Sequence, residues 1–69
     1  MKRYIYEPET GTITDIIAVK TITVSDKDYY GLEKELAIAS TMNVTYMTNE
    51  ELRQDVLDRY FSKYEGSEK

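Results

Sequence analysis

The sequence contains no cysteine and no histidine. These absences exclude a disulfide framework, thiol catalysis, the usual zinc sites and any catalytic triad built on imidazole. The remaining acids and bases are carboxylates, lysines and tyrosines, and no pattern brings two of them together in one pocket. We therefore expect no catalytic residue, no metal ligand and no cofactor, and we do not expect an enzyme.

Glycine and proline are also scarce, with three glycines and one proline. The glycines are isolated, and none of them forms a phosphate-binding turn between a strand and a helix. No apolar run reaches the roughly 20 residues that a membrane helix needs, and Met1-Lys2-Arg3 is not followed by the apolar core of a secretory signal. The sequence therefore predicts a cytoplasmic protein that does not bind membranes.

Positive charge is in deficit, because nine Lys and Arg stand against 13 Asp and Glu, for a formal net charge of −4. The acidic excess lies in residues 25–69, since the charges of residues 1–24 cancel. An acidic surface repels phosphate backbones. We therefore expect no direct nucleic-acid binding, and the expected partner is another protein with a basic surface.

The first 24 residues have the composition of β-strands. Tyr4–Tyr6 and Thr12–Ile17 flank a segment that contains the one proline and a glycine, which is typical of a hairpin turn. The apolar residues change phase around Ala18–Lys20, which indicates a bend there. A third strand is predicted over Thr21–Val24.

A first helix is predicted from Asp26 to Thr41, with Ser25 as its N-cap. Gly31 weakens this helix and can admit a close neighbour. The next segment, Asn43–Met47, is predicted as a short strand between two helices.

The second helix has the clearest local signal, a capping box formed by Thr48 and Glu51. It is predicted to run from about Asn49 to about Tyr64. The chain of 69 residues is then one domain over 1–64 with a frayed polar tail over 65–69. The fold class is α+β, a small antiparallel sheet of three to four strands packed with two helices in the approximate order ββ(β)αβα.

Tyrosine is in excess, with seven residues where an average composition of roughly 3 % would give about two. Tyrosine concentrates at recognition surfaces, although a chain with no tryptophan and one phenylalanine can also use it to fill the core. Tyr29 and Tyr30 are helix neighbours and cannot both face the core. We therefore predict that they contribute to partner binding, with Tyr30 exposed.

The apolar residues of the second helix cover about half of its circumference, which is too wide for a single contact. We therefore expect part of this arc to meet a second chain, with Arg53 near its middle. The partner-binding residues predicted in this helix are Glu50, Arg53, Leu57, Asp58, Phe61 and Tyr64.

These features together favour a small acidic intracellular protein that binds other proteins and self-associates, as a homodimer for example. A core of this size contributes little stability, which favours association. The alternative is a phage or mobile-element inhibitor whose acidic surface imitates nucleic acid and binds a host nucleic-acid-binding protein.

Overall fold

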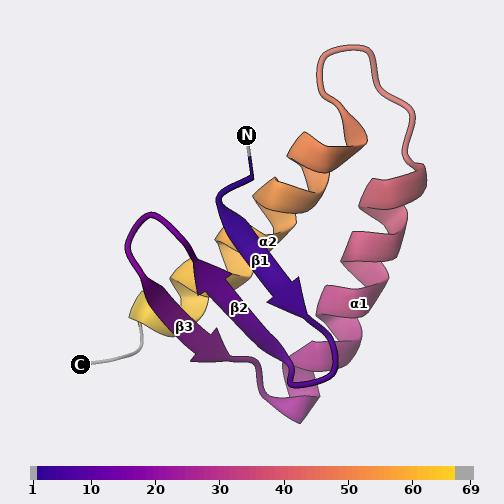
Figure 1. Ribbon diagram of the computed structural model, residues 1–69. Helices are drawn as coiled ribbons and strands as arrows, with labels where there is room; N and C mark the ends of the chain where they lie inside the picture. Colours follow the sequence, from indigo (N-terminus) through magenta and orange to yellow (C-terminus); the bar gives the residue numbers. More distant parts are fainter. Residues whose placement is uncertain (1, 67–69) are drawn as a thin grey trace.

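The computed structural model describes residues 2–66 and contains three strands followed by two helices (Figure 1). The antiparallel sheet has the order β1-β2-β3. The predicted α+β class is confirmed, and the order of elements is βββαα because no strand lies between the helices. The elements are β1 (Tyr4–Glu7), β2 (Thr12–Asp15), β3 (Lys20–Thr23), α1 (Asp26–Thr41) and α2 (Asn49–Gly66).

The β1–β2 hairpin forms where proline and glycine predict a turn. Gly11 has a φ of 67°, and its N–H donates to the Glu7 carbonyl over 2.8 Å. A positive φ is easy for glycine because it has no Cβ. The resulting register places Tyr4 opposite Asp15 and puts both side chains on the buried face of the sheet.

The predicted bend between the second and third strands is a turn over residues 16–19. It begins earlier than expected, because β2 ends at Asp15 and Ile16 and Ile17 are therefore not strand residues. β3 pairs with β2 so that Ile22 lies opposite Ile13, and both side chains are buried.

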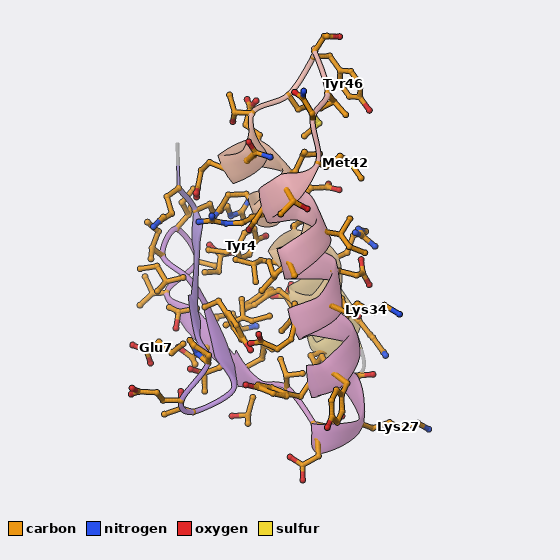
Figure 2. All side chains as sticks on the ribbon, turned by 90° about the vertical axis from the view of Figure 1, so that its right-hand side faces the viewer. Tyr4, Glu7, Lys27, Lys34, Met42 and Tyr46 are labelled. Carbon is orange, nitrogen blue, oxygen red and sulfur yellow. The ribbon has the colours of Figure 1, made fainter. Side chains whose placement is uncertain are left out.

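The core lies between the sheet and the helix pair. One side of α2 contacts all three strands, and another side contacts α1, which runs beside α2 (Figure 1). In Figure 2, side chains fill the space between the sheet and α1. The buried apolar residues are Tyr4, Ile13, Ile22, Val24, Leu32, Ala39, Val56, Leu57 and Phe61.

Both predicted ends of α1 are confirmed. The Ser25 Oγ accepts a hydrogen bond from the Asp28 N–H over 3.3 Å, as an N-cap should. The close neighbour expected at Gly31 is also present, since a Cβ added there would lie 2.8 Å from the Tyr60 Oη. The glycine thus allows α1 and α2 to approach closely.

The prediction of a strand over Asn43–Met47 is wrong, because this segment belongs to the loop between the helices. A strand needs a neighbouring strand to pair with. The loop lies at the end of the helix pair away from the β1–β2 hairpin turn (Figure 1), and Tyr46 projects at the tip of the loop in Figure 2. β-propensity alone therefore did not produce a strand here.

The capping box at the start of α2 is confirmed. The Thr48 N–H donates to the Glu51 Oε1 over 2.9 Å, and the Glu51 N–H donates to the Thr48 Oγ1 over 3.1 Å. α2 begins at Asn49 as predicted and continues to Gly66, past the predicted end at Tyr64. Residues 65 and 66 of the predicted tail are therefore helical, and residues 67–69 lie outside the described part of the chain.

We predict that Thr48→Ala lowers the free energy of unfolding by about 1 kcal/mol, because it removes the acceptor of the Glu51 N–H. Urea titration followed by circular dichroism measures this loss. Thr45→Ala, in the exposed loop, is the matched control and should leave stability unchanged within about 0.5 kcal/mol. Equal stability of the two variants would contradict the prediction.

Candidate functional site

The turn between β2 and β3 exposes a run of apolar residues, Ile16-Ile17-Ala18-Val19. The exposed fractions are 47 % for Ile16, 63 % for Ile17 and 83 % for Val19. Tight turns usually consist of glycine, asparagine, aspartate or proline. Contiguous exposed apolar side chains are characteristic of contact surfaces, so this turn is the first candidate for a site.

The backbone of the turn is strained at Val19, which has a φ of 55°. This left-handed conformation suits glycine or asparagine and is rare for a β-branched residue. Strain of this kind is concentrated at functional sites, where the surrounding structure enforces it. The sequence therefore keeps an exposed apolar side chain at a position where glycine would fit better.

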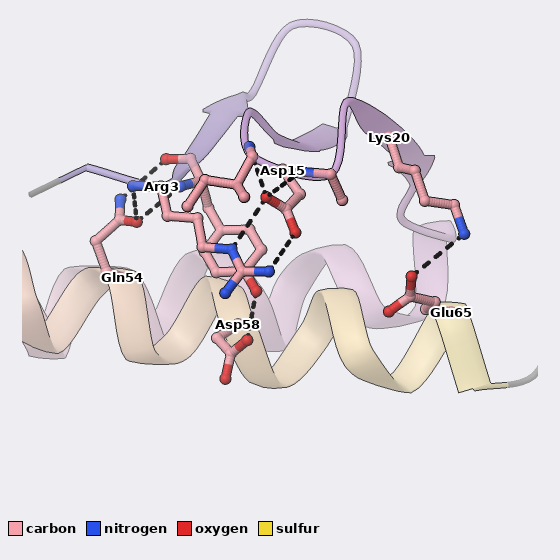
Figure 3. Close-up of polar contacts among 9 residues, drawn as sticks. Arg3, Asp15, Lys20, Gln54, Asp58 and Glu65 are labelled. Carbon is pink, nitrogen blue, oxygen red and sulfur yellow. Dashed lines mark hydrogen bonds and ion pairs between the residues drawn. The ribbon is translucent and has the colours of Figure 1, made fainter.

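The buried carboxylate of Asp15, at the end of β2, binds the backbone of the turn. Asp15 is 2 % exposed, and among residues 2–66 it is the one buried charged residue. Its Oδ1 accepts hydrogen bonds from the Ile17 and Ala18 N–H groups over 3.0 and 3.2 Å. The Arg3 guanidinium donates to both carboxylate oxygens, over 3.0 and 2.9 Å (Figure 3). The bidentate geometry fixes the carboxylate and, through it, two amides of the turn.

Contacts with α2 hold this arrangement in place. The Arg3 guanidinium lies over the Tyr4 ring, 5.3 Å from its centroid, and the Tyr4 hydroxyl donates to Asp58. The Gln54 side-chain amide accepts from the Tyr4 N–H over 2.7 Å and donates to the Tyr4 carbonyl over 2.9 Å (Figure 3). The turn is thus connected to α2 through hydrogen bonds, including one from the Arg3 N–H to the Gln54 Oε1 over 2.9 Å, and through the contact of Arg3 with the Tyr4 ring.

The Arg3 guanidinium and the two turn amides lower the pKa of Asp15 to about 2, against the opposing effect of burial. Tyr64 and Lys63 likewise hold the pKa of Asp28 below its ordinary value. A carboxyl with a lowered pKa in the folded state stabilises the fold above its unfolded-state pKa, here 3.8, and loses that contribution as the pH falls through the folded value.

We therefore predict that the melting temperature is steady from about pH 7 to pH 5 and falls between about pH 4 and pH 2. Thermal melts followed by circular dichroism at each pH test this. Asp15→Asn, which has no titrating group at the site, should show a shallower fall. A melting temperature that stays constant down to pH 2 would contradict the prediction.

The tyrosine excess has a largely structural explanation. Four tyrosines each donate a hydrogen bond from the hydroxyl to a carboxylate on another element. Burial, followed by the neighbouring carboxylate, raises the pKa of Tyr4 to about 12 and also raises the pKa values of Tyr6 and Tyr60. The pairs are Tyr4 with Asp58, Tyr6 with Glu33, Tyr60 with Glu35, and Tyr64 with Asp28.

The acidic excess is also largely engaged within the chain. Ion pairs at 2.8 to 3.7 Å involve Asp15, Asp28, Glu35, Glu50, Asp55 and Glu65. Within residues 2–66, the acids that make neither an ion pair nor a side-chain hydrogen bond are Glu7, Glu9 and Asp26. These three lie around the β1–β2 hairpin loop and the start of α1, so most carboxylates are not arranged as a free anionic surface.

The structure separates Tyr29 from Tyr30. Tyr30 is 84 % exposed, as predicted, whereas Tyr29 is half-buried.

Glu50 and Arg53 form an ion pair over 2.8 Å and line a groove of about 380 Å³ between β1, α1 and α2. None of these residues lies in the Ile16–Val19 turn, so the structure does not gather the predicted residues around it.

The prediction that the wide apolar arc of α2 meets a second chain is wrong for Phe61, whose side chain is 1 % exposed. Leu57, 4 % exposed, also belongs to the core, and it lines the groove between β1, α1 and α2 together with Glu50 and Arg53. The arc is wide because α2 packs between the sheet and α1. Tyr64 packs against the core and accepts the Ser25 N–H over 2.7 Å, and Asp58 accepts the Tyr4 hydroxyl.

Sequence reasoning missed the exposed turn as a site. The sequence did contain a signal for this turn. The apolar residues change phase where there is no glycine or proline, which predicts a bend, and the apolar side chains of a bend cannot all be buried. A bend by itself predicts a turn and not a binding site. The pair of Arg3 with the buried Asp15 was not detectable, since it joins residues from opposite ends of a hairpin.

Within residues 2–66, no helix is long and apolar enough to cross a membrane, and no group of carboxylates is placed to hold a metal ion. No protein-family model matches the chain, and no curated protein or solved structure matches it either.

Proposed function

We propose that this chain is a small protein-binding module whose recognition element is the Ile16–Val19 turn. The observation that carries the proposal is the strained, exposed apolar turn held by the buried carboxylate of Asp15. A preformed loop loses little conformational entropy on binding, which improves affinity. Cytoplasmic localisation, expected from the sequence, is part of the same proposal.

The partner in this proposal is a protein with a concave apolar pocket. The turn is convex and projects at the end of the sheet opposite the hairpin loop (Figure 1). A lipid surface is less favoured, because the cations beside the turn, Arg3 and Lys20, are ion-paired with Asp15 and Glu65. The acidic-inhibitor alternative is also less supported, since most carboxylates are bound within the chain.

Site-specific photocrosslinking tests the proposal. A benzophenone amino acid placed at Ile17 should crosslink one protein in the native host, whereas the same group at Tyr30 should not. Tyr30 is the matched control because it is at least as exposed and lies on α1. Binding to the crosslinked protein should weaken by about tenfold or more in Ile17→Ser and change little with salt. The same products from both positions, or none from Ile17, would contradict the proposal.

We predict that Val19→Gly separates stability from binding. Removing the left-handed strain should raise the free energy of unfolding by about 0.5 to 1 kcal/mol after the entropy cost of glycine. Loss of the apolar side chain should weaken binding to the crosslinked partner. Urea titration and a binding isotherm measure the two effects. A variant that is less stable than the wild type by more than about 1 kcal/mol would show that the turn is not strained.

A further inference from the structure

The two edges of the sheet differ. At the β1 edge, the Gln54 side chain binds both main-chain groups of Tyr4, over 2.7 and 2.9 Å, in the way that a neighbouring strand would. The Tyr6 hydroxyl crosses to Glu33 on α1. Side chains therefore protect the β1 edge against pairing with another chain.

The β3 edge has no such protection. The Val24 N–H donates to the Gly11 carbonyl over 2.8 Å, which makes Gly11–Val24, and then Ile13–Ile22, the hydrogen-bonded pairs of this ladder. The N–H and C=O groups of Thr21 and Thr23 consequently point away from β2. Both residues are exposed, and within residues 2–66 no strand other than β2 pairs with β3, although α2 contacts β3 across one face of the sheet.

We propose that β3 pairs antiparallel with β3 of a second copy of this chain. Thr21 and Thr23 lie on either side of Ile22, so a two-fold axis at Ile22 brings Thr21 of each copy opposite Thr23 of the other. Each such pair exchanges both main-chain hydrogen bonds, which joins the two sheets into one.

The structure disfavours the neighbouring registers. A shift toward the C-terminal side would need the Ser25 N–H, which already donates to the Tyr64 Oη over 2.7 Å. A shift toward the N-terminal side would pair Val19, whose φ of 55° is not that of a strand. The register centred on Ile22 is therefore the one that uses every outward main-chain group of β3.

Charge does not oppose this register. Lys20 of one copy lies opposite Val24 of the other, and Lys20 already forms an ion pair with Glu65 of its own chain over 3.2 Å. No like charges face each other along the paired strands. This dimer rests on the β3 edge and not on the Ile16–Val19 turn, so it can fail while the proposed function holds, and the reverse.

Sedimentation equilibrium of the full chain and two variants tests the dimer. Thr23→Pro removes an N–H that points away from β2, so the ladder with β2 stays intact while the outer edge is blocked. Thr23→Val keeps the N–H and is the matched control. We expect the wild type and Thr23→Val to reach twice the mass of one chain at millimolar concentration, and Thr23→Pro to dimerise at least tenfold more weakly. A wild type that remains at the mass of one chain, or a folded Thr23→Pro that dimerises as well as the wild type, overturns the proposal.

Amide hydrogen exchange of the wild type decides the question even if Thr23→Pro does not fold. We expect exchange at Thr21 and Thr23 to slow at least tenfold between micromolar and millimolar protein, while exchange at Tyr6, on the protected edge, does not change. Concentration-independent exchange at both threonines overturns the proposal.

Discussion

Asp15→Ala is expected to lower the melting temperature by about 10 °C or more. The variant leaves the Arg3 guanidinium without its carboxylate and the Ile17 and Ala18 amides without their acceptor. Unsatisfied groups in a partly buried site cost much more than the net gain of the hydrogen bonds they had made. Thermal unfolding followed by circular dichroism measures the shift.

Asp55→Ala is the matched control for this experiment. Asp55 also pairs with an arginine, Arg59, but over 3.7 Å and with both side chains more than half exposed. An exposed pair contributes little to stability, so the melting temperature should change by no more than a few degrees. Equal shifts in Asp15→Ala and Asp55→Ala would contradict the role given to the buried carboxylate.

Phe61→Ala is expected to reduce the free energy of unfolding by about 3 to 5 kcal/mol. Phe61 is the largest fully buried side chain, and its ring lies 5.5 Å from the Tyr4 ring, tilted by 47°. Truncation loses the burial of the ring and leaves a cavity between α2 and the sheet. In so small a domain this loss approaches the whole of the stability. Urea titration, with added osmolyte if the variant is partly unfolded, measures it.

Tyr30→Ala gives the comparison for an aromatic side chain on the surface. Tyr30 is 84 % exposed, so its truncation should change stability by less than about 0.5 kcal/mol. If Phe61→Ala changes the free energy of unfolding as little as Tyr30→Ala does, Phe61 is not a core residue, and the surface contact predicted from the sequence would stand. The two variants therefore separate core from surface on the helices.

Features set by neighbouring residues could be predicted from the sequence. The starts of α1 and α2 follow from caps that act over three residues, Ser25 with Asp28 and Thr48 with Glu51. The hairpin turn follows from one glycine with a positive φ. The exposure of Tyr30 follows from helical geometry alone.

Features set by distant residues could not be predicted in this way. The half-apolar circumference of α2 was correctly identified, but only the tertiary arrangement shows that the sheet and α1 cover both of its sides. The segment Asn43–Met47 has strand composition but no strand beside it. The conformation of the Ile16–Val19 turn depends on Arg3 and Asp15, which a hairpin brings together.

The most direct measurement of the recognition element is backbone ¹⁵N relaxation of the free protein at residues 16–19, together with the coupling constant that reports φ at Val19. A turn fixed by Asp15 before any partner binds should have order parameters near 0.85, like those of the strands, and a positive φ at Val19. Order parameters below about 0.6 with an averaged coupling constant would mean that the turn is mobile in the free protein, and would contradict a preformed binding element.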